Sequence, residues 1–171
     1  MIAYLLLVGA VAAERVVELV VSKRHAAWAF ARGGVEYGRA HYLPMAVIHT
    51  LLLVACVGEV VVFDRPFVAW LGWPMVGFVV ATQALRWWCI ATLGPQWNTR
   101  VIVVPNVPLV TTGPYRWLRH PNYVAVAVEV AALPLVHSAW LTAIVFSLVN
   151  GVLLLRFRIP AEERALATVS P

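Results

Sequence analysis

Residues 122–156 read NYVAVAVEVAALPLVHSAWLTAIVFSLVNGVLLLR, and between Val130 and Leu155 this stretch contains no Asp, Glu, Lys or Arg. An uncharged apolar run of this length is typical of membrane-spanning helices. The segment PLVHS at residues 134–138 interrupts the run near its middle, and proline beside small polar residues marks a turn. We therefore expect two short helices that form a hairpin through the membrane. One long, tilted helix is the alternative.

The composition of the whole chain also indicates a membrane protein. Its 171 residues are 62% apolar and 12% charged, with a mean hydropathy of +0.82, whereas soluble domains carry about 25% charged residues. The length suffices for several spans of about 20 residues each and leaves little for a separate soluble domain. We therefore expect one all-α integral membrane domain over residues 1–171.

Apolar segments of helical length recur along the chain. They cover residues 2–21, 42–63, 67–93, 122–136 and 139–156. We expect about five transmembrane helices, three within residues 1–93 and two in the hairpin that opens residues 122–171. The first segment lacks the basic start and the cleavage site of a signal peptide, so we expect it to be retained. Residues 94–121 are too polar and too rich in Pro and Gly to cross a membrane, and VIVV at residues 101–104 is a candidate strand within them.

Lysine and arginine set the expected orientation, because short cytoplasmic loops are enriched in these residues. The first loop, the third loop and the tail are basic, whereas the second loop has only Arg65, beside Asp64, and the hairpin turn has none. Five spans with the N-terminus outside place every basic segment, and the C-terminus, in the cytoplasm. The net charge of +5 is scattered at helix ends rather than over one soluble face, so it does not indicate a nucleic-acid partner.

Polar residues gather just before and just after the predicted hairpin. GPYR at residues 113–116 and HPNY at residues 120–123 precede it, and RIPAEE at residues 158–163 follows it. Ionisable residues at a membrane are costly and are usually functional. Both ends of a hairpin lie on one side, so we expect these segments to meet in one cytoplasmic site. The structural alternative is a helix-opening histidine, an aromatic-belt tyrosine, and a solvated pair of Arg158 and Glu162 at i, i+4 spacing.

These segments resemble the C-terminal signature of the isoprenylcysteine carboxyl methyltransferase family, which runs G-x-Y-x-x-x-R-H-P-x-Y and then R-I-x-x-E-E after a helical hairpin. The match covers about residues 105–166. Members of this family are integral membrane enzymes that use S-adenosylmethionine. Upstream, RVVELVVSKR at residues 15–24, GVEYG at residues 34–38, and then His41 and His49 make the chain similar to the short bacterial members, which methylate polyketide alkylpyrones and alkylresorcinols.

The resemblance and the chemistry of the cofactor together assign the site. The resemblance places Arg158 and Glu162 at the acceptor end as catalytic residues. S-adenosylmethionine offers an adenine, a ribose diol, a carboxylate, an ammonium and a sulfonium, so its site needs aromatic faces, donors and acceptors. The expected cofactor-binding residues are Pro108, Leu109, Val110, Tyr115, Arg119, His120, Pro121, Asn122, Tyr123 and Glu163. The family has a polar residue near position 107, where this chain has Val107.

The acceptor decides whether a general base is needed. A prenylcysteine carboxylate and the acidic enol of a 4-hydroxy-2-pyrone are largely ionised at neutral pH, whereas a resorcinol is not. His41, His49 and Glu129 are the candidate bases for a resorcinol, and structural hydrogen bonding is the alternative role of the two histidines. From the resemblance we expect O-methylation of a long-chain alkylpyrone or related type III polyketide. An isoprenylcysteine-like acceptor, or an NADPH-dependent membrane reductase of the sterol type, is the alternative.

Five charged residues interrupt the apolar segments near their predicted cytoplasmic ends: Glu14, Arg15, Glu18, Arg86 and Glu129. They can line one cavity that faces the cytoplasm. In the alternative, Arg15 pairs with Glu18 at i, i+3 and Arg86 extends to the membrane interface. No His or Cys spacing typical of a metal site is present, and Cys56 and Cys89 are expected to be apolar packing residues within spans.

Overall fold

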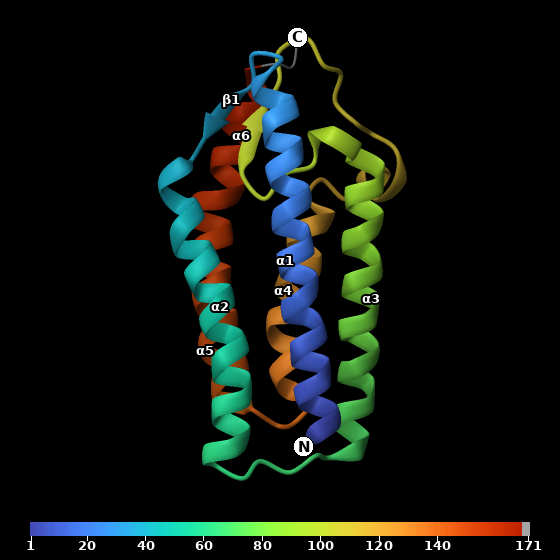
Figure 1. Cartoon of the computed structure of the whole chain (residues 1–171), viewed down its shortest axis with the longest axis vertical. Helices are drawn as coiled ribbons and strands as arrows, with labels where there is room; N and C mark the ends of the chain where they lie inside the picture. The colour runs from blue at the N-terminus through green and yellow to red at the C-terminus, as the bar shows by residue number, and fades with distance from the viewer. Residues whose placement is uncertain (169–171) are drawn as a thin grey trace.

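The computed structural model describes residues 1–168 as a bundle of helices that run along one long axis (Figure 1). The long helices are α1 (Ile2–Phe30), α2 (Arg39–Val62), α3 (Ala69–Leu93), α4 (Pro121–Leu135) and α5 (Trp140–Leu153). They fall on the five apolar segments of the sequence. The main difference is that α1 continues to Phe30, because the polar residues beyond residue 21 extend the helix past the apolar part of the bundle.

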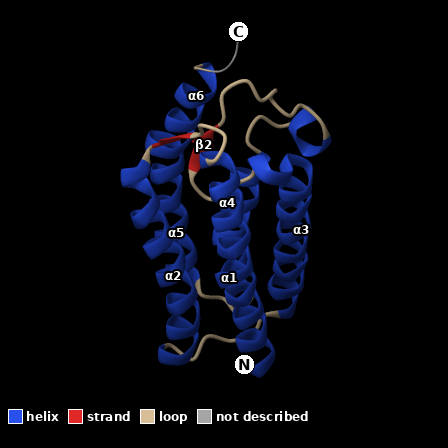
Figure 2. Cartoon of the chain, turned by 45° about the horizontal axis from the view of Figure 1, so that its top comes forward, coloured by secondary structure: helices blue, strands red, loops and turns tan. Residues whose placement is uncertain are grey.

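The connections are distributed between the two ends of the bundle. The loop between α2 and α3 and the turn between α4 and α5 lie at the end that carries the N-terminus (Figure 1). The opposite end carries β1 (Val35–Tyr37), β2 (Val101–Val103) and α6 (Ile159–Ala167) (Figures 1 and 2). The three basic segments of the sequence therefore share one end of the molecule.

The hairpin of α4 and α5 is present, and the alternative of one long helix is wrong. A turn at residues 136–138 separates the two helices, and Ser138 adopts a left-handed φ of 56° within it. The backbone N–H of Ala139 donates to the carbonyl of Pro134 at 3.0 Å and closes the turn. Because the chain reverses here, the residues that open α4 and those that follow α5 return to the same end.

A small sheet joins the first loop to the third loop. The strands β1 and β2 pair antiparallel, with Val35 opposite Val103 and Tyr37 opposite Val101, so the candidate strand of the sequence is β2. Helix α6 packs against both strands. The first loop, the third loop and the tail thus form one layer over the end of the bundle (Figure 2).

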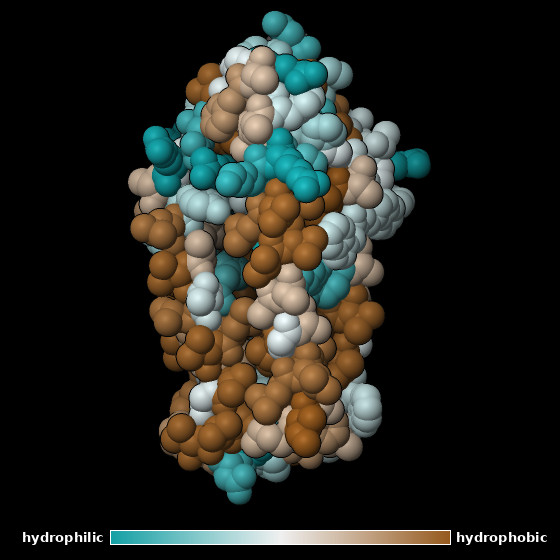
Figure 3. Space-filling model, in the orientation of Figure 1, coloured by the Kyte–Doolittle hydropathy of each residue, from teal (hydrophilic) through white to brown (hydrophobic). Residues whose placement is uncertain are grey.

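The outer surface is that of an integral membrane protein. Within residues 1–168, three helical stretches are long and apolar enough to cross a membrane: Arg39–Val62, Ala69–Gln96 and Trp140–Ala167. The last joins α5 to α6 through η3 (Leu154–Arg158). Figure 3 shows hydrophobic side chains over the middle of the visible face, with hydrophilic ones concentrated toward the end that carries β1 and α6.

The buried carboxylate of Glu59 on α2 caps the start of α5. The Oε1 and Oε2 atoms of Glu59 accept from the backbone N–H groups of Leu141 at 3.2 Å and Thr142 at 2.7 Å, and Arg65 Nη2 lies 2.9 Å from Glu59 Oε1. The first N–H groups of a helix have no partner within the helix and carry its positive dipole end. Glu59 satisfies two of them from a neighbouring helix, a role that no sequence pattern indicates.

We expect replacement of Glu59 to loosen the hairpin. Glu59→Leu leaves two buried N–H groups and Arg65 without their acceptor, and should lower the free energy of unfolding by about 1–3 kcal/mol. Glu59→Gln retains one acceptor oxygen and should cost less. Thermal unfolding in detergent measures both, with Asp64→Asn at the same end as the control. A melting temperature of Glu59→Leu equal to that of Asp64→Asn would contradict this role.

Candidate active site

A cavity of about 360 Å³ lies at the end of the bundle that carries the sheet. Its walls come from α1, α2, α3, the segment between α3 and α4, the start of α4, and the region from η3 to α6. Most of the site residues expected from the sequence line it: Leu109, Val110, Tyr115, Arg119, His120, Pro121, Asn122, Tyr123, Arg158 and Glu162. Pro108 is exposed beside the cavity, and Glu163 lies at its rim with a side chain 45% exposed.

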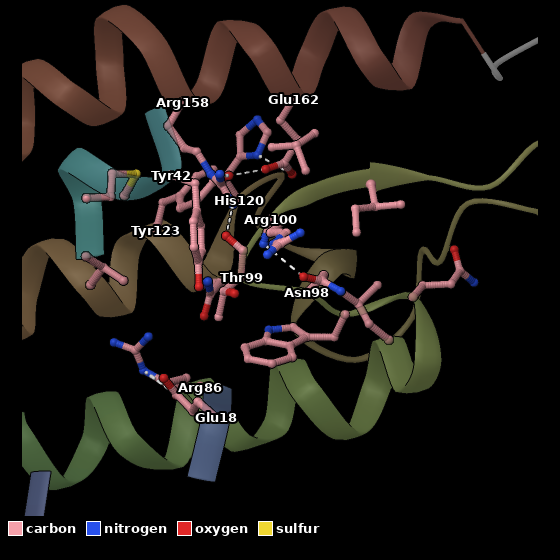
Figure 4. A pocket seen from close by; sticks show the side chains of 18 of the residues that line it. Glu18, Tyr42, Arg86, Asn98, Thr99, Arg100, His120, Tyr123, Arg158 and Glu162 are labelled. Carbon is pink, nitrogen blue, oxygen red and sulfur yellow. Dashed lines mark hydrogen bonds and ion pairs between the residues drawn. The ribbon is translucent and has the colours of Figure 1, made fainter. Parts of the chain in front are cut away.

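Three side chains from the two ends of the hairpin meet in this cavity. Arg158 Nε donates to the Tyr123 hydroxyl at 3.1 Å, and that hydroxyl donates to Glu162 Oε2. Figure 4 shows the three side chains pointing toward one another. Arg158 is only 5% exposed, so the alternative of a solvated pair with Glu162 is wrong. Tyr123 joins the two residues instead, because the hairpin returns them to the start of α4.

The position of Arg158 depends on a local widening of the last helix. The residues of η3 form a π-helical turn that ends at Arg158, and α6 begins directly after it. Pro160 has no N–H to give to the carbonyl four residues earlier, which breaks the α-helical ladder at this point. π-Helical turns inside α-helices frequently occur at functional sites. Here the turn carries the guanidinium, whose Nη2 also donates to the carbonyl of Thr99.

His120 stands at the mouth of the cavity, directly before the helix-opening Pro121. Its ring stacks on that of Tyr123 with the ring centres 5.6 Å apart. Its Nδ1 lies 3.4 Å from Glu162 Oε1, and its Nε2 lies 3.5 Å from Glu163 Oε1. The interaction with the Glu162 carboxylate raises the pKa of His120 above its ordinary value. The two carboxylates therefore stabilise the protonated form of the ring relative to a free histidine.

The segment that carries Tyr115 packs closely onto α3. Tyr115 belongs to η2 (Gly113–Arg116), and Gly113 adopts a left-handed φ of 57°. A Cβ at Gly113 would lie 2.6 Å from Thr92 Oγ1, so only glycine allows this approach. Burial raises the pKa of Tyr115, which keeps its hydroxyl protonated and available as a donor.

The opposite wall of the cavity is formed by residues that were not predicted from the sequence. Asn98 and Thr99 follow α3 and are fixed to α1 by Ser22, whose hydroxyl donates to Asn98 Oδ1 at 2.7 Å and accepts from the Thr99 N–H at 3.1 Å. The Arg100 guanidinium lies over the Tyr42 ring, 5.2 Å from its centre. All but Ser22 line the cavity and are labelled in Figure 4. The polar run WNTR at residues 97–100, immediately after a span, was the available signal.

Four charged side chains form an ion-pair network at the inner side of the cavity. Arg15 on α1 pairs with Glu18 as the sequence suggested, and also with Glu129 on α4 at 2.6 Å. Arg86 on α3 lies 3.2 Å from Glu18 and 3.1 Å from Glu129. Arg86 is only 5% exposed, so the alternative in which it extends to the membrane interface is wrong. Arg15, Glu18 and Arg86 line the cavity, and Figure 4 shows Glu18 and Arg86 across from Arg158.

Comparison with known proteins places this geometry in a family. The profile of the isoprenylcysteine carboxyl methyltransferase family matches residues 75–168, which include most of α3, the intervening segment, the hairpin and α6. The uncharacterized protein YpbQ of Bacillus subtilis is 36% identical over 166 residues, which are 96% of this chain and 97% of that protein. An uncharacterized protein of Haemophilus influenzae is 25% identical over 162 residues, 93% of this chain and 92% of the relative.

No solved structure matches the chain at a comparable level. The family match nevertheless covers more than half of the chain, and it contains both ends of the hairpin that form the Arg158, Tyr123 and Glu162 cluster. Family members are membrane methyltransferases that take the methyl group from S-adenosylmethionine. This chain belongs to the isoprenylcysteine carboxyl methyltransferase family.

Proposed function

We propose that this protein transfers a methyl group from S-adenosylmethionine to an oxygen of a lipid-tailed acceptor within the membrane. The observation that carries the proposal is the cluster of Arg158, Tyr123 and Glu162 beside His120. It lies in a cavity that reaches from the polar end of the bundle toward the apolar helices. A water-soluble donor and a lipophilic acceptor can therefore approach one site from two environments.

The residues present fit S-adenosylmethionine. A cavity of about 360 Å³ is within the range of small-molecule sites, which is roughly 300–1,000 Å³. Asn122 Oδ1 and Trp97 Nε1 are buried, belong to residues that line the cavity, and have no hydrogen-bond partner within residues 1–168. Buried polar atoms are normally paired. An unpaired acceptor and an unpaired donor suit the hydroxyl, amine and ring nitrogen atoms of a nucleoside.

We assign the expected residues to two parts of this site. Pro108, Leu109 and Val110 supply backbone and apolar contacts, and Tyr115, His120, Pro121, Asn122 and Tyr123 supply aromatic faces and polar groups. Arg119 and Glu163 act from the rim, at which the side chain of Arg119 is 85% exposed. Arg158 and Glu162 serve the reacting groups as catalytic residues.

The donor supplies an electrophilic methyl group bound to a sulfonium. Alignment in a site with little water removes much of the barrier to an in-line displacement. Arg158 can hold an acceptor oxygen, because its guanidinium points into the cavity while Tyr123 and the Thr99 carbonyl fix its direction. Glu162 in turn fixes the Tyr123 hydroxyl. The apolar hairpin beneath them excludes water.

The basic loops also support a proposal for the membrane arrangement. We propose one domain over residues 1–171 with five transmembrane helices, the N-terminus outside and the C-terminus in the cytoplasm. Support comes from the basic loops, which share one end of the bundle (Figure 1), and from the rule that such loops face the cytoplasm. The site then opens toward cytosolic S-adenosylmethionine in what we propose to be a bacterial inner membrane.

For the acceptor we propose a long-chain alkylpyrone or a related type III polyketide. Apolar side chains of Leu19, Met45, Leu53 and Val126 line the cavity beyond its polar mouth and suit an alkyl tail surrounded by membrane lipid. The resemblance of residues 15–49 to the short bacterial members supports a polyketide. An isoprenylcysteine-like acceptor is the alternative that a substrate assay decides.

Replacement of His120 tests the cofactor site. His120→Ala removes a ring hydrogen-bond donor at the cavity mouth and should cost about 1–3 kcal/mol of S-adenosylmethionine binding free energy. Calorimetry on detergent-purified protein measures the affinity, with NADPH as a second titrant. Binding of NADPH in place of S-adenosylmethionine would favour a sterol-type reductase. Equal affinity of the wild-type and His120→Ala proteins for S-adenosylmethionine would show that His120 does not bind the cofactor.

Replacement of Glu162 or Tyr123 tests the catalytic cluster. Glu162→Gln and Tyr123→Phe should each lower turnover by about tenfold or more, because both release Arg158 from its fixed direction and small misalignments are costly. The double variant should lose little more than either single variant, since the residues act as one unit. Arg164→Gln, an exposed change on α6, is the control. Near wild-type rates in Glu162→Gln would indicate that Glu162 has no catalytic role. It would then be part of a surface ion pair that contributes a few tenths of a kcal/mol to stability.

The acceptor is tested by tail length and by competition. Burial contributes about 0.8 kcal/mol per methylene, so each methylene removed from an alkylpyrone should raise KM by up to about fourfold. Membranes incubated with labelled S-adenosylmethionine, an alkylpyrone and a farnesylcysteine analogue report which acceptor is labelled. Label on the prenylcysteine alone would show that a prenylcysteine, and not a polyketide, is the acceptor. The proposed methyltransferase activity would not be affected.

A further inference from the structure

A histidine in the wall of the cavity has one ring nitrogen free. His49 lies on α2 and lines the cavity, and its Nδ1 is 2.7 Å from the carbonyl oxygen of Met45. A carbonyl only accepts, so Nδ1 carries the proton and Nε2 of the neutral ring presents a lone pair. Within residues 1–168 Nε2 has no hydrogen-bond partner. The fold thus fixes one tautomer and leaves a proton acceptor available to a ligand.

The other two candidate bases are placed elsewhere. His41 does not line the cavity, and its ring packs against that of Phe157 with the centres 5.1 Å apart. Glu129 does not line it either, and its carboxylate is held by both Arg15 and Arg86. The structure therefore distinguishes His49 from two residues that the sequence could not separate from it.

The charges near His49 are balanced. The charged groups near it are Arg15 and Glu18 on α1, Arg86 on α3 and Glu129 on α4. Arg86 contacts the carboxylates of Glu18 and Glu129, and Arg15 contacts these two and that of Glu14. This part of the cavity thus offers no excess positive charge to an anion. Transfer of an anion from water into such a site is costly without a free counter-charge. A neutral hydroxyl group is the form of acceptor that this region accommodates.

We propose that His49 is the general base for an acceptor that binds as an un-ionised phenol hydroxyl, such as an alkylresorcinol, whereas an acceptor that is already an enolate reacts without it. The proposal rests on the O-methyltransferase function proposed above and adds un-ionised phenols to the acceptors that the site can methylate. The hydroxyl proton passes to Nε2 while the oxygen bonds to the methyl carbon. The carbon–sulfur bond breaks, its electron pair goes to sulfur, and the sulfonium becomes a thioether.

The proton taken from the acceptor is held by His49 and then leaves to water. His49 becomes an imidazolium, whose new N–H faces the cavity and whose Nδ1–H still bonds to Met45. The carboxylates of Glu18 and Glu129 offset the added charge until the proton leaves to water through the polar mouth. The methyl ether that forms has no hydroxyl donor, so it loses its hydrogen bond to Nε2 and is released more readily.

Two variants separate proton transfer from hydrogen bonding. His49→Gln retains an oxygen acceptor but cannot take a proton at neutral pH, whereas His49→Leu does neither. With an alkylresorcinol, His49→Gln should lower kcat by about 100-fold or more. With an alkyl-4-hydroxy-2-pyrone of equal tail length, assayed above the pKa of its enol, the same change should have little effect. His41→Gln on the same helix is the control and should retain wild-type rates on both acceptors.

Binding without the donor gives a readout independent of turnover. Calorimetric titration of an alkylresorcinol into the purified protein should show near wild-type affinity for His49→Gln and about fivefold or greater weakening for His49→Leu. The wild-type rate with the resorcinol should fall at acidic pH as His49 is protonated, and this limb of the profile should be absent in His49→Gln.

The opposing results are equally specific. Turnover of the resorcinol by His49→Gln at the wild-type rate, or an acidic limb that persists in that variant, would overturn the proposal. Equal affinity of His49→Leu for the resorcinol would do the same. Failure of the wild-type protein to bind S-adenosylmethionine would instead refute the proposed methyltransferase function, so the two failures are distinguishable.

Discussion

The buried network of Arg15, Glu18, Arg86 and Glu129 is the interaction on which the arrangement of the bundle depends. It links α1, α3 and α4, and three of its members are at most 5% exposed. Helices surrounded by lipid gain little from hydrophobic burial, because lipid tails are as apolar as their side chains. The ion pairs among these three helices supply a specific attraction in place of that gain. Each member is therefore held by the others, and loss of one leaves an unpaired buried charge.

The network also sets the geometry of the site. Glu129 lies on the same helix as Tyr123, and Ser22, on the same helix as Arg15, anchors Asn98 and Thr99. The position of α1 against α4 therefore determines where the Thr99 carbonyl meets Arg158. The hairpin then needs only to return Arg158 and Glu162 to Tyr123. In this way an ion-pair network inside the bundle fixes a hydrogen-bonded cluster at its end.

Periodic and compositional signals predicted much of the fold. The helices and the hairpin turn follow from apolar length and from Pro134, because few other conformations satisfy the backbone in a membrane. The extension of α1 to Phe30 was missed, since polar residues beyond a span carry no hydropathy signal. The role of Glu59 was missed for a different reason. Its partners are backbone N–H groups of Leu141 and Thr142, and such groups leave no mark on a sequence.

The site could be predicted where residues form a motif, and not where the fold brings them together. The cluster around Tyr123 was found because HPNY and RIPAEE flank the hairpin, although the hydroxyl that joins Arg158 to Glu162 could not be foreseen. Asn98 and Thr99 depend on Ser22, far away in the sequence. The tautomer of His49 depends on the Met45 carbonyl, which every residue four positions earlier in a helix offers, so spacing alone could not distinguish a base from a packed histidine.

The two ends of the cavity differ in charge, and this difference explains how one site can take reactants of opposite character. His120 and the exposed Arg119 lie at the mouth, where solvent stabilises charge and a zwitterionic donor can enter without full desolvation. Toward the apolar helices the charges are already paired, and free polar capacity is limited to groups such as His49 Nε2. A charged donor is thus retained at the mouth while a neutral acceptor enters from the lipid side. Their meeting point beside Arg158 and Tyr123 is where a fixed hydrogen-bond direction is of most use to a displacement reaction.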